Sequence, residues 1–212
     1  AAGRADIDLK LVLWKLAYEA HSGTDPAAGE EALGDIGEHQ LTHALKTLNK
    51  HDWNWVHTLI EAIKLRAGLL LERETGVFTF PHRTFQEYLA GVHLLNQIDF
   101  EMQGVTLAVQ GRHWREVLLL ATGQLAQTGA VGRALALVNR LAAVRAGSDE
   151  SAWRRVWLAG DALQEIGVRR ADEDDVGHEL VRRVRGRLGA LLEGGHLTAR
   201  ERAAAGDTLA AL

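Results

Sequence analysis

Proline is scarce in this chain, and that scarcity is the strongest constraint on its fold. Pro26 and Pro81 are the only two prolines among the 212 residues. Because proline in a helix interior removes a hydrogen bond and clashes with the preceding turn, the long proline-free stretches are able to be helical. Apolar residues repeat at the i, i+3, i+4, i+7 spacing over residues 7–20, which is typical of a packed helix. The sequence therefore predicts a mainly α-helical protein.

The first part of the chain mixes helical and strand patterns. Helices are predicted over 7–20, 30–48 and 52–66, the last with Asp52 as its N-cap. Two short apolar runs follow, at 69–72 and 77–80, and they flank four residues that end in glycine, which favours a β-hairpin. Three helices and a hairpin in this order form the layout of a winged-helix domain. We assign that domain to residues 1–82.

After Pro81 the pattern is helical to the last residue. From residue 113 onward, successive helix starts lie about 17 to 26 residues apart, the spacing of helical hairpins that stack into a solenoid. Residues 83–212 are therefore predicted to form a HEAT-like α-solenoid. Its predicted helices span 84–98, 113–127, 130–145, 150–166, 176–192 and 198–211.

Charge and composition argue against several classes of protein. The formal net charge of −4 supplies no overall cationic field for a nucleic-acid backbone or an anionic membrane, so neither is expected as a partner. The chain contains no cysteine, which excludes disulfides, thiolate metal sites and cysteine nucleophiles and suits a cytoplasmic protein. No apolar run reaches the roughly 20 residues that a membrane-spanning helix needs.

The segment around His82 carries most of the functional information. Thr84 and Glu87 have the Thr-x-x-Glu spacing of a capping box, which predicts that a helix begins at Phe85. His82 would then lie between the hairpin and a helix N-terminus, where free amides and the helix dipole favour an anion. An imidazole there can donate a hydrogen bond to a phosphate oxygen, with Arg83 nearby. Alternatively, His82 bonds a carbonyl and locks the hairpin to the helix.

Residues 78–90, with the sequence FTFPHRTFQEYLA, resemble the signature that closes the winged-helix region of NACHT-type STAND NTPases. These proteins include relatives of NOD-like immune receptors and bacterial NACHT defence and signalling proteins. The resemblance implies that His82 reaches the β-phosphate of bound ADP and helps to hold a closed, inactive state. It also implies a signal-transduction role, in which the winged helix acts as a latch and the helical array senses or relays a ligand signal.

The remaining nucleotide-binding machinery is expected in another module. The chain has no G-x-x-x-x-G-K-[ST] loop, and therefore lacks the phosphate cradle and lysine of an NTPase site. We expect no catalytic residue and no cofactor in this chain, with ADP or ATP and Mg bound by an upstream NTPase module in cis. The absence of an initiator methionine suggests a piece of a longer protein. Further expected partners are a protein or other ligand on the array and, through self-assembly, a second copy of the parent protein.

Two other functions stay open at this stage. One is a helical scaffold for protein–protein interaction without nucleotide dependence. The other is a winged-helix DNA-binding regulator, whose recognition helix would span 52–66. In that helix Lys64 and Arg66 are offset by Asp52 and Glu61, which disfavours binding to a phosphate backbone.

Several other clusters receive structural interpretations. His39 and His43 could share a metal, but Gln40 stands where a carboxylate base would be needed and no third ligand is evident, so no metal site is expected. Trp153 and Trp157 are predicted to pack between helices. The four arginines at 182, 183, 185 and 187 are predicted to be solvated or to meet an acidic partner. The acidic run 172–175 is predicted to mark a loop and the start of the next helix.

The end of the chain adds one more resemblance. Residues 197–212, LTARERAAAGDTLAAL, are similar to the E-R-A-x-A-G-x-x-L-A helix that often ends helical arrays of this family. The resemblance implies that this helix is part of the array.

Overall fold

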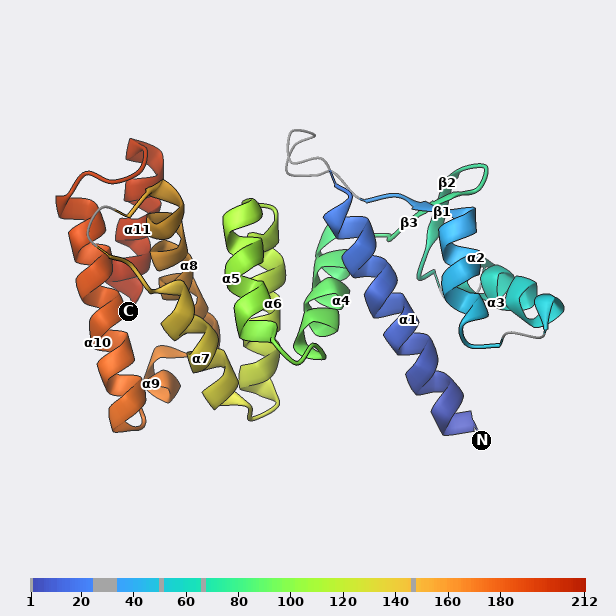
Figure 1. The fold of residues 1–212 in the computed structure, drawn as a ribbon, viewed down its shortest axis with the longest axis horizontal. Helices are drawn as coiled ribbons and strands as arrows, with labels where there is room; N and C mark the ends of the chain where they lie inside the picture. Colours follow the sequence, from blue (N-terminus) through green and yellow to red (C-terminus); the bar gives the residue numbers. More distant parts are fainter. Residues whose placement is uncertain (1, 25–33, 50–51, 66–67, 146–147) are drawn as a thin grey trace. The chain divides into compact units, whose positions relative to one another are not determined.

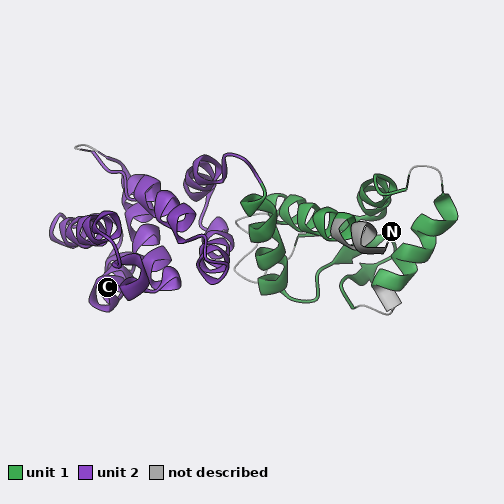
Figure 2. Ribbon diagram, turned by 90° about the horizontal axis from the view of Figure 1, so that it is seen from below, with its two compact units in different colours: residues 1–96 green, residues 97–212 purple. Residues whose placement is uncertain are grey.

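The structure is a computed structural model that describes residues 2–24, 34–49, 52–65, 68–145 and 148–212, with the side chains of 2–7, 64 and 65 excepted. It divides into two compact units, residues 1–96 and 97–212, which are coloured separately in Figure 2. Each unit is described below by itself. The prediction of a mainly α-helical chain with a small β-hairpin followed by a helical array is confirmed.

Unit 1 combines helices with a small antiparallel sheet (Figure 1). Helix α1 packs along α4, and α2 packs against α3. The strands pair in the order β1-β3-β2, with Ile36 opposite Phe78 and Leu71 opposite Thr79. The elements are α1 (Ala2–Ser22), β1 (Ile36–Gly37), α2 (Glu38–Lys46), α3 (Trp53–Leu65), β2 (Leu71–Glu74), β3 (Val77–Thr79) and α4 (Arg83–Leu95).

The core of unit 1 lies where the helices meet the sheet. Its buried members come from all four helices and from β1 and β3, and include Leu16, Ile36, Leu41, Val56, Phe78, Phe80 and Leu89. The β2–β3 hairpin turns at Thr75 and Gly76, and Gly76 has φ +75°. Because this left-handed conformation is open to glycine without strain, the predicted role of Gly76 in ending the turn is confirmed.

The helix predicted over 30–48 is the main disagreement in unit 1. Residues 30–33 lie outside the described residues, and residues 36–37 form β1 instead of a helical turn. Pairing with β3 buries Ile36 completely, and the Glu38 amide donates to the Gly76 carbonyl at 2.8 Å. Burial and sheet hydrogen bonds outweigh the weak helix propensity of this segment, so α2 begins only at Glu38.

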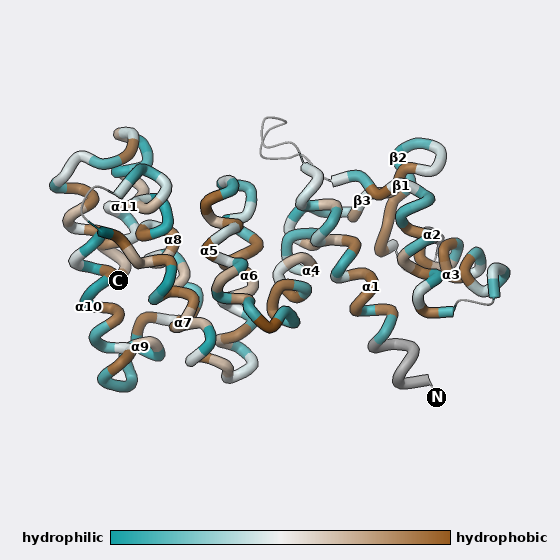
Figure 3. Tube along the Cα trace, in the orientation of Figure 1, coloured by the Kyte–Doolittle hydropathy of each residue, from teal (hydrophilic) through white to brown (hydrophobic). Residues whose placement is uncertain are grey.

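Unit 2 is an array of helices in two layers. Helices α5, α7 and α10 form one layer, while α6, α8 and α11 form the other, and α8 packs against helices of both layers. Figure 3 shows hydrophobic and hydrophilic residues alternating along these helices, as expected for elements with one buried side. The helices are α5 (Phe100–Gln110), α6 (Trp114–Gln127), α7 (Val131–Leu141), α8 (Glu150–Ile166), α9 (Val168–Ala171), α10 (Asp175–Glu193) and α11 (Ala199–Ala211).

The predicted helix 150–166 coincides with α8, and most of the other predicted helices agree with the structure to within a few residues. Helix α5 was not predicted, because its apolar residues do not form one stripe: Phe100 and Leu107 are buried, whereas Met102 and Val109 are exposed. Helix α9 is a single turn, too short for a periodic signal.

The boundary between the two units lies one helix later than the predicted boundary after residue 82. Helix α4 belongs to unit 1, because its buried face, which includes Gln86, Ala90 and Leu94, packs along α1. No helix among the described residues is both long and apolar enough to cross a membrane.

Candidate functional site

The connection between β3 and α4 places His82 at the start of a helix. His82 is the N-cap residue of α4, with an extended backbone at φ −140° and ψ 143°. Its carbonyl accepts hydrogen bonds from the amides of Phe85 and Gln86, both at 3.1 Å. The backbone of His82 is therefore fixed by the first turn of α4.

The imidazole of His82 points to solvent. The side chain is exposed and makes no capping hydrogen bond. Among the described residues, the His82 side chain has no ion-pair or hydrogen-bond partner. The alternative in which it bonds a carbonyl and locks the hairpin to the helix is therefore not observed among them. A fixed backbone with an exposed imidazole beside a helix N-terminus is suited to meet an anion on another surface.

The predicted capping box at Thr84 is wrong. Helix α4 begins at Arg83, two residues before the start that a Thr84 cap requires, and Glu87 accepts a hydrogen bond from Arg83 Nε at 2.7 Å. Glu87 is buried, and a buried carboxylate needs a charged partner. The ion pair with Arg83 therefore holds Glu87 in place. It also engages the Arg83 guanidinium, which the sequence placed near a possible phosphate.

The first turn of α4 is anchored to α1 by a buried polar contact. Gln86 is completely buried, and its Nε2 lies 3.4 Å from Nδ1 of His21, which is 2% exposed. In the last turn of α4, the ring of His93 lies 5.0 Å from that of Tyr18. Burial lowers the pKa of His93, as does the positive charge of Lys15. These contacts fix α4 along α1.

The segment that resembles the NACHT signature is thus mostly core. Phe78, Phe80, Gln86, Glu87 and Leu89 are buried. Its outward-facing residues are His82, Thr84 and Tyr88. Sequence reasoning missed the contact between Gln86 and His21, since no local spacing links residues so far apart in the chain.

The exposed face of α3 does not resemble a surface for DNA. Its exposed residues are Trp53, Asn54, His57, Thr58 and Glu61, and no cation is present among its described side chains. The Nζ of Lys46 on α2 lies 3.1 Å from the centre of the Trp53 ring. The side chains of Lys64 and Arg66 lie outside the described residues.

The two histidines of α2 stack on each other, and no third metal ligand joins them among the described residues. The rings of His39 and His43 are 6.3 Å apart and nearly parallel. Within the described parts of the chain, no group of three His, Cys, Asp or Glu side chains could hold a metal ion.

In unit 2 the most connected charged residue is Glu201 at the start of α11. Its carboxylate accepts hydrogen bonds from Arg154 on α8 at 2.8 Å and from Arg112 in the α5–α6 connection. Glu201 also forms a capping box with Thr198. Burial opposes ionisation, but the bonds from Arg154 and Thr198 and the charge of Arg112 lower the pKa of Glu201 to about 2.

A second polar group lies further along α11. Thr208 donates to Asp161 on α8 at 2.7 Å and accepts from Trp157 Nε1 at 3.0 Å. Arg115 on α6 bonds the other oxygen of Asp161 at 2.7 Å. Burial raises the pKa of Asp161, although Thr208 and Arg115 both stabilise its charged form.

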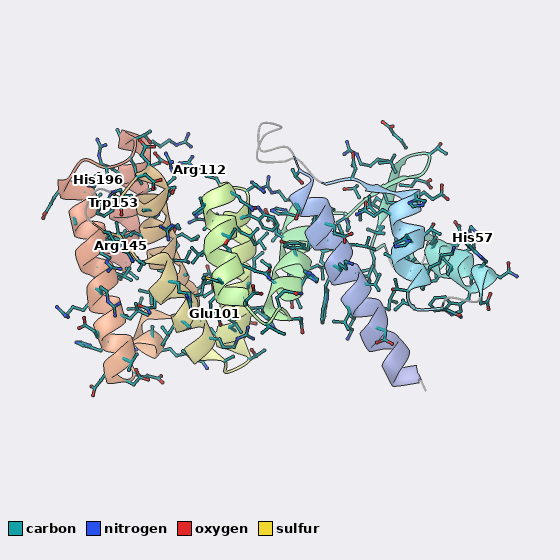
Figure 4. The ribbon with its side chains drawn as sticks, in the orientation of Figure 1. His57, Glu101, Arg112, Arg145, Trp153 and His196 are labelled. Carbon is teal, nitrogen blue, oxygen red and sulfur yellow. The ribbon has the colours of Figure 1, made fainter. Side chains whose placement is uncertain are left out.

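Of the two tryptophans of α8, Trp157 contacts a neighbouring helix as predicted, whereas Trp153 contacts the α10–α11 linker. Trp157 bonds Thr208 as described above, whereas the ring of Trp153 stacks on His196 with centroids 4.2 Å apart, and Figure 4 shows these two side chains together.

The charged clusters of α10 have structural partners. Arg183 bonds Asn139 on α7 at 2.8 Å, and Arg187 donates to the Ala142 carbonyl. Arg182 pairs with Glu179 on its own helix. In the acidic run, Asp174 caps α10 by accepting from the Gly177 amide, which confirms the predicted helix start.

Comparison with known protein families connects the first unit to a defined domain. Residues 7–94 match the family described as "winged helix-turn-helix domain C-terminal to NACHT". No curated protein and no solved structure significantly matches the chain. The matched residues extend from α1 into the last turn of α4, which is the extent of the compact first unit. Residues 7–94 therefore form a winged helix-turn-helix domain of the kind that lies C-terminal to NACHT.

Proposed function

We propose that this chain is the non-catalytic regulatory and sensor region of a NACHT-like signal-transducing NTPase. Its winged-helix domain fits a regulatory region of a NACHT protein. The observation that carries the proposal further is the exposed imidazole of His82 on the fixed backbone at the start of α4.

In the proposed mechanism, His82 donates a hydrogen bond to the β-phosphate of ADP held by an NTPase module in cis. The positive end of the α4 dipole adds to this attraction. Such a contact favours the closed state only by the difference in binding free energy between the closed and open states. Exchange of ADP for ATP with Mg would then shift the balance toward the open state.

The helical array has the second role in this proposal. Unit 2 would bind a protein or another ligand in the cytoplasm and relay that event to the winged helix. The chain itself would supply neither the phosphate cradle nor the catalytic residues of the NTPase.

The test is the rate of ADP release from the protein that carries this chain together with its NTPase module. His82→Ala should raise that rate at least about tenfold, because a hydrogen bond to a charged group contributes about 1.5–3 kcal/mol. His39→Ala is the matched control, because His39 is also an exposed histidine of unit 1 but lies outside the α4 start. It should leave the rate unchanged.

Other outcomes would favour the alternatives. Equal ADP release from the wild type and the His82 variant, with ligand binding retained by the array, would support a scaffold without nucleotide dependence. Tight, salt-dependent binding to duplex DNA would instead support a DNA-binding regulator.

A further inference from the structure

Helix α11 is held in the array by few apolar side chains. Its buried residues are Glu201, Ala205 and Thr208, and Leu197 and Leu212 are buried at its two ends. The neighbouring helix α10 instead buries five large aliphatic side chains, Leu180, Val181, Val184, Leu188 and Leu191. Because hydrophobic stabilisation grows with the apolar area buried, α11 gains less from burial than α10 does.

Polar contacts supply much of the remaining attachment. Glu201 joins α11 to Arg154 of α8 and to Arg112, and Thr208 joins it to Asp161 and Trp157 of α8. Such ion pairs weaken as salt screens them, particularly where a partner such as Arg112 is exposed. The attachment of α11 should therefore depend on ionic strength more than the attachment of α10 does.

The linker between α10 and α11, residues 194–198, is strained. Leu197 has φ +69°, and it is the one non-glycine residue with a positive φ among those that the structure describes. This conformation is unfavourable for a residue with a branched side chain. Arg202 of α11 holds the linker by donating to the Leu197 carbonyl at 2.6 Å. Detachment of α11 would release both this contact and the strain.

We propose that α11 is a detachable helix, which leaves α8 as a unit by rotation in the 194–198 linker while the remainder of unit 2 stays folded. Detachment exposes the face of α8 that carries Arg154, Trp157 and Asp161. This gives the array two states, with α11 either bound to α8 or released from it.

Hydrogen exchange of the whole chain, followed by mass spectrometry, tests the proposal. At 0.1 M NaCl the amides of α11 should exchange at least about tenfold faster than those of α10. At 1 M NaCl the rate in α11 should rise further while that in α10 stays the same. Equal protection of the two helices at both salt concentrations would overturn the proposal.

Two variants and a control locate the cause. Glu201→Gln removes the ion pairs with little change in shape, and Thr208→Val removes the hydroxyl contacts. Each should accelerate exchange in α11 severalfold or more, and α11 should remain less protected than α10. Asp207→Asn, at an exposed position of the same helix, should have no effect. If α11 and α10 exchange at equal rates in either of the first two variants, α11 opens only together with the rest of the unit, and detachment of α11 alone is refuted.

Discussion

At the scale of single residues, the start of α4 separates structural from outward-facing groups. Gln86 and Glu87 are buried and bind His21 and Arg83, whereas His82 is exposed on a fixed backbone. The start of α4 therefore combines a buried contact that attaches it to α1 with an imidazole that is exposed to solvent.

The corrected cap of α4 leads to the first prediction. If His82 is the N-cap residue, Thr84→Ala should change the free energy of unfolding by no more than about 0.5 kcal/mol. Glu87→Ala should cost about 2 kcal/mol or more, because it leaves Arg83 without its partner. Urea unfolding at pH 7 measures both. A loss of about 1 kcal/mol or more in the Thr84 variant would restore the capping box.

The depressed pKa of Glu201 predicts how stability depends on pH. Since its folded pKa of about 2 lies below the ordinary glutamate pKa of 4.5, the folded state binds fewer protons. The stabilisation is therefore complete above pH 4.5 and is lost as the pH falls toward 2.

Glu201→Gln should lower stability at pH 7 and give a flatter profile between pH 4.5 and 2, as measured by urea unfolding at each pH. Parallel profiles for the variant and the wild type would contradict the assignment of this pKa shift.

At the scale of elements, close helix contacts depend on glycine at one position in particular. A Cβ atom placed on Gly160 of α8 would lie 2.7 Å from Thr208 Cγ2 and 3.0 Å from Leu188 Cδ1. Gly160 therefore lets α11 and α10 approach α8. In contrast, a Cβ on Gly186 of α10 would have no neighbour within 4 Å.

Replacing these two glycines by alanine should have opposite effects on the stability of unit 2. Gly160→Ala should destabilise unit 2 by about 1–3 kcal/mol, because the added methyl group overlaps its neighbours. Gly186→Ala should stabilise it by about 0.5–1 kcal/mol, because alanine is the better helix former and meets open space. Thermal unfolding of the two variants checks both signs. Stabilisation by both substitutions would show that helix propensity, not packing, decides the effect at Gly160.

At the scale of the whole molecule, the chain consists of two units that each have their own hydrophobic core. Unit 1 is a small sheet covered by helices, and unit 2 is a layered helical array centred on α8. The match to the winged-helix domain C-terminal to NACHT covers the first unit. The proposed nucleotide contact therefore belongs to unit 1, while the detachable helix belongs to unit 2.

The sequence by itself was sufficient for what depends on neighbouring residues. Helical periodicity predicted α8, the position of Gly76 predicted the hairpin turn, and Asp52 and the acidic run 172–175 were recognised at helix starts. These features arise from side-chain spacing and backbone preferences within one or two turns of the chain.

Only the tertiary structure decided the features that depend on distant residues. Strand β1 forms because β3 accepts Ile36 beside Phe78, and the cap of α4 lies at His82 because burial draws Glu87 to Arg83. The attachment of Glu201 to Arg154 joins two helices, α11 and α8, with α9 and α10 between them in sequence. Such pairings gain their free energy from burial, which exists only once the chain has folded, and no local spacing records them.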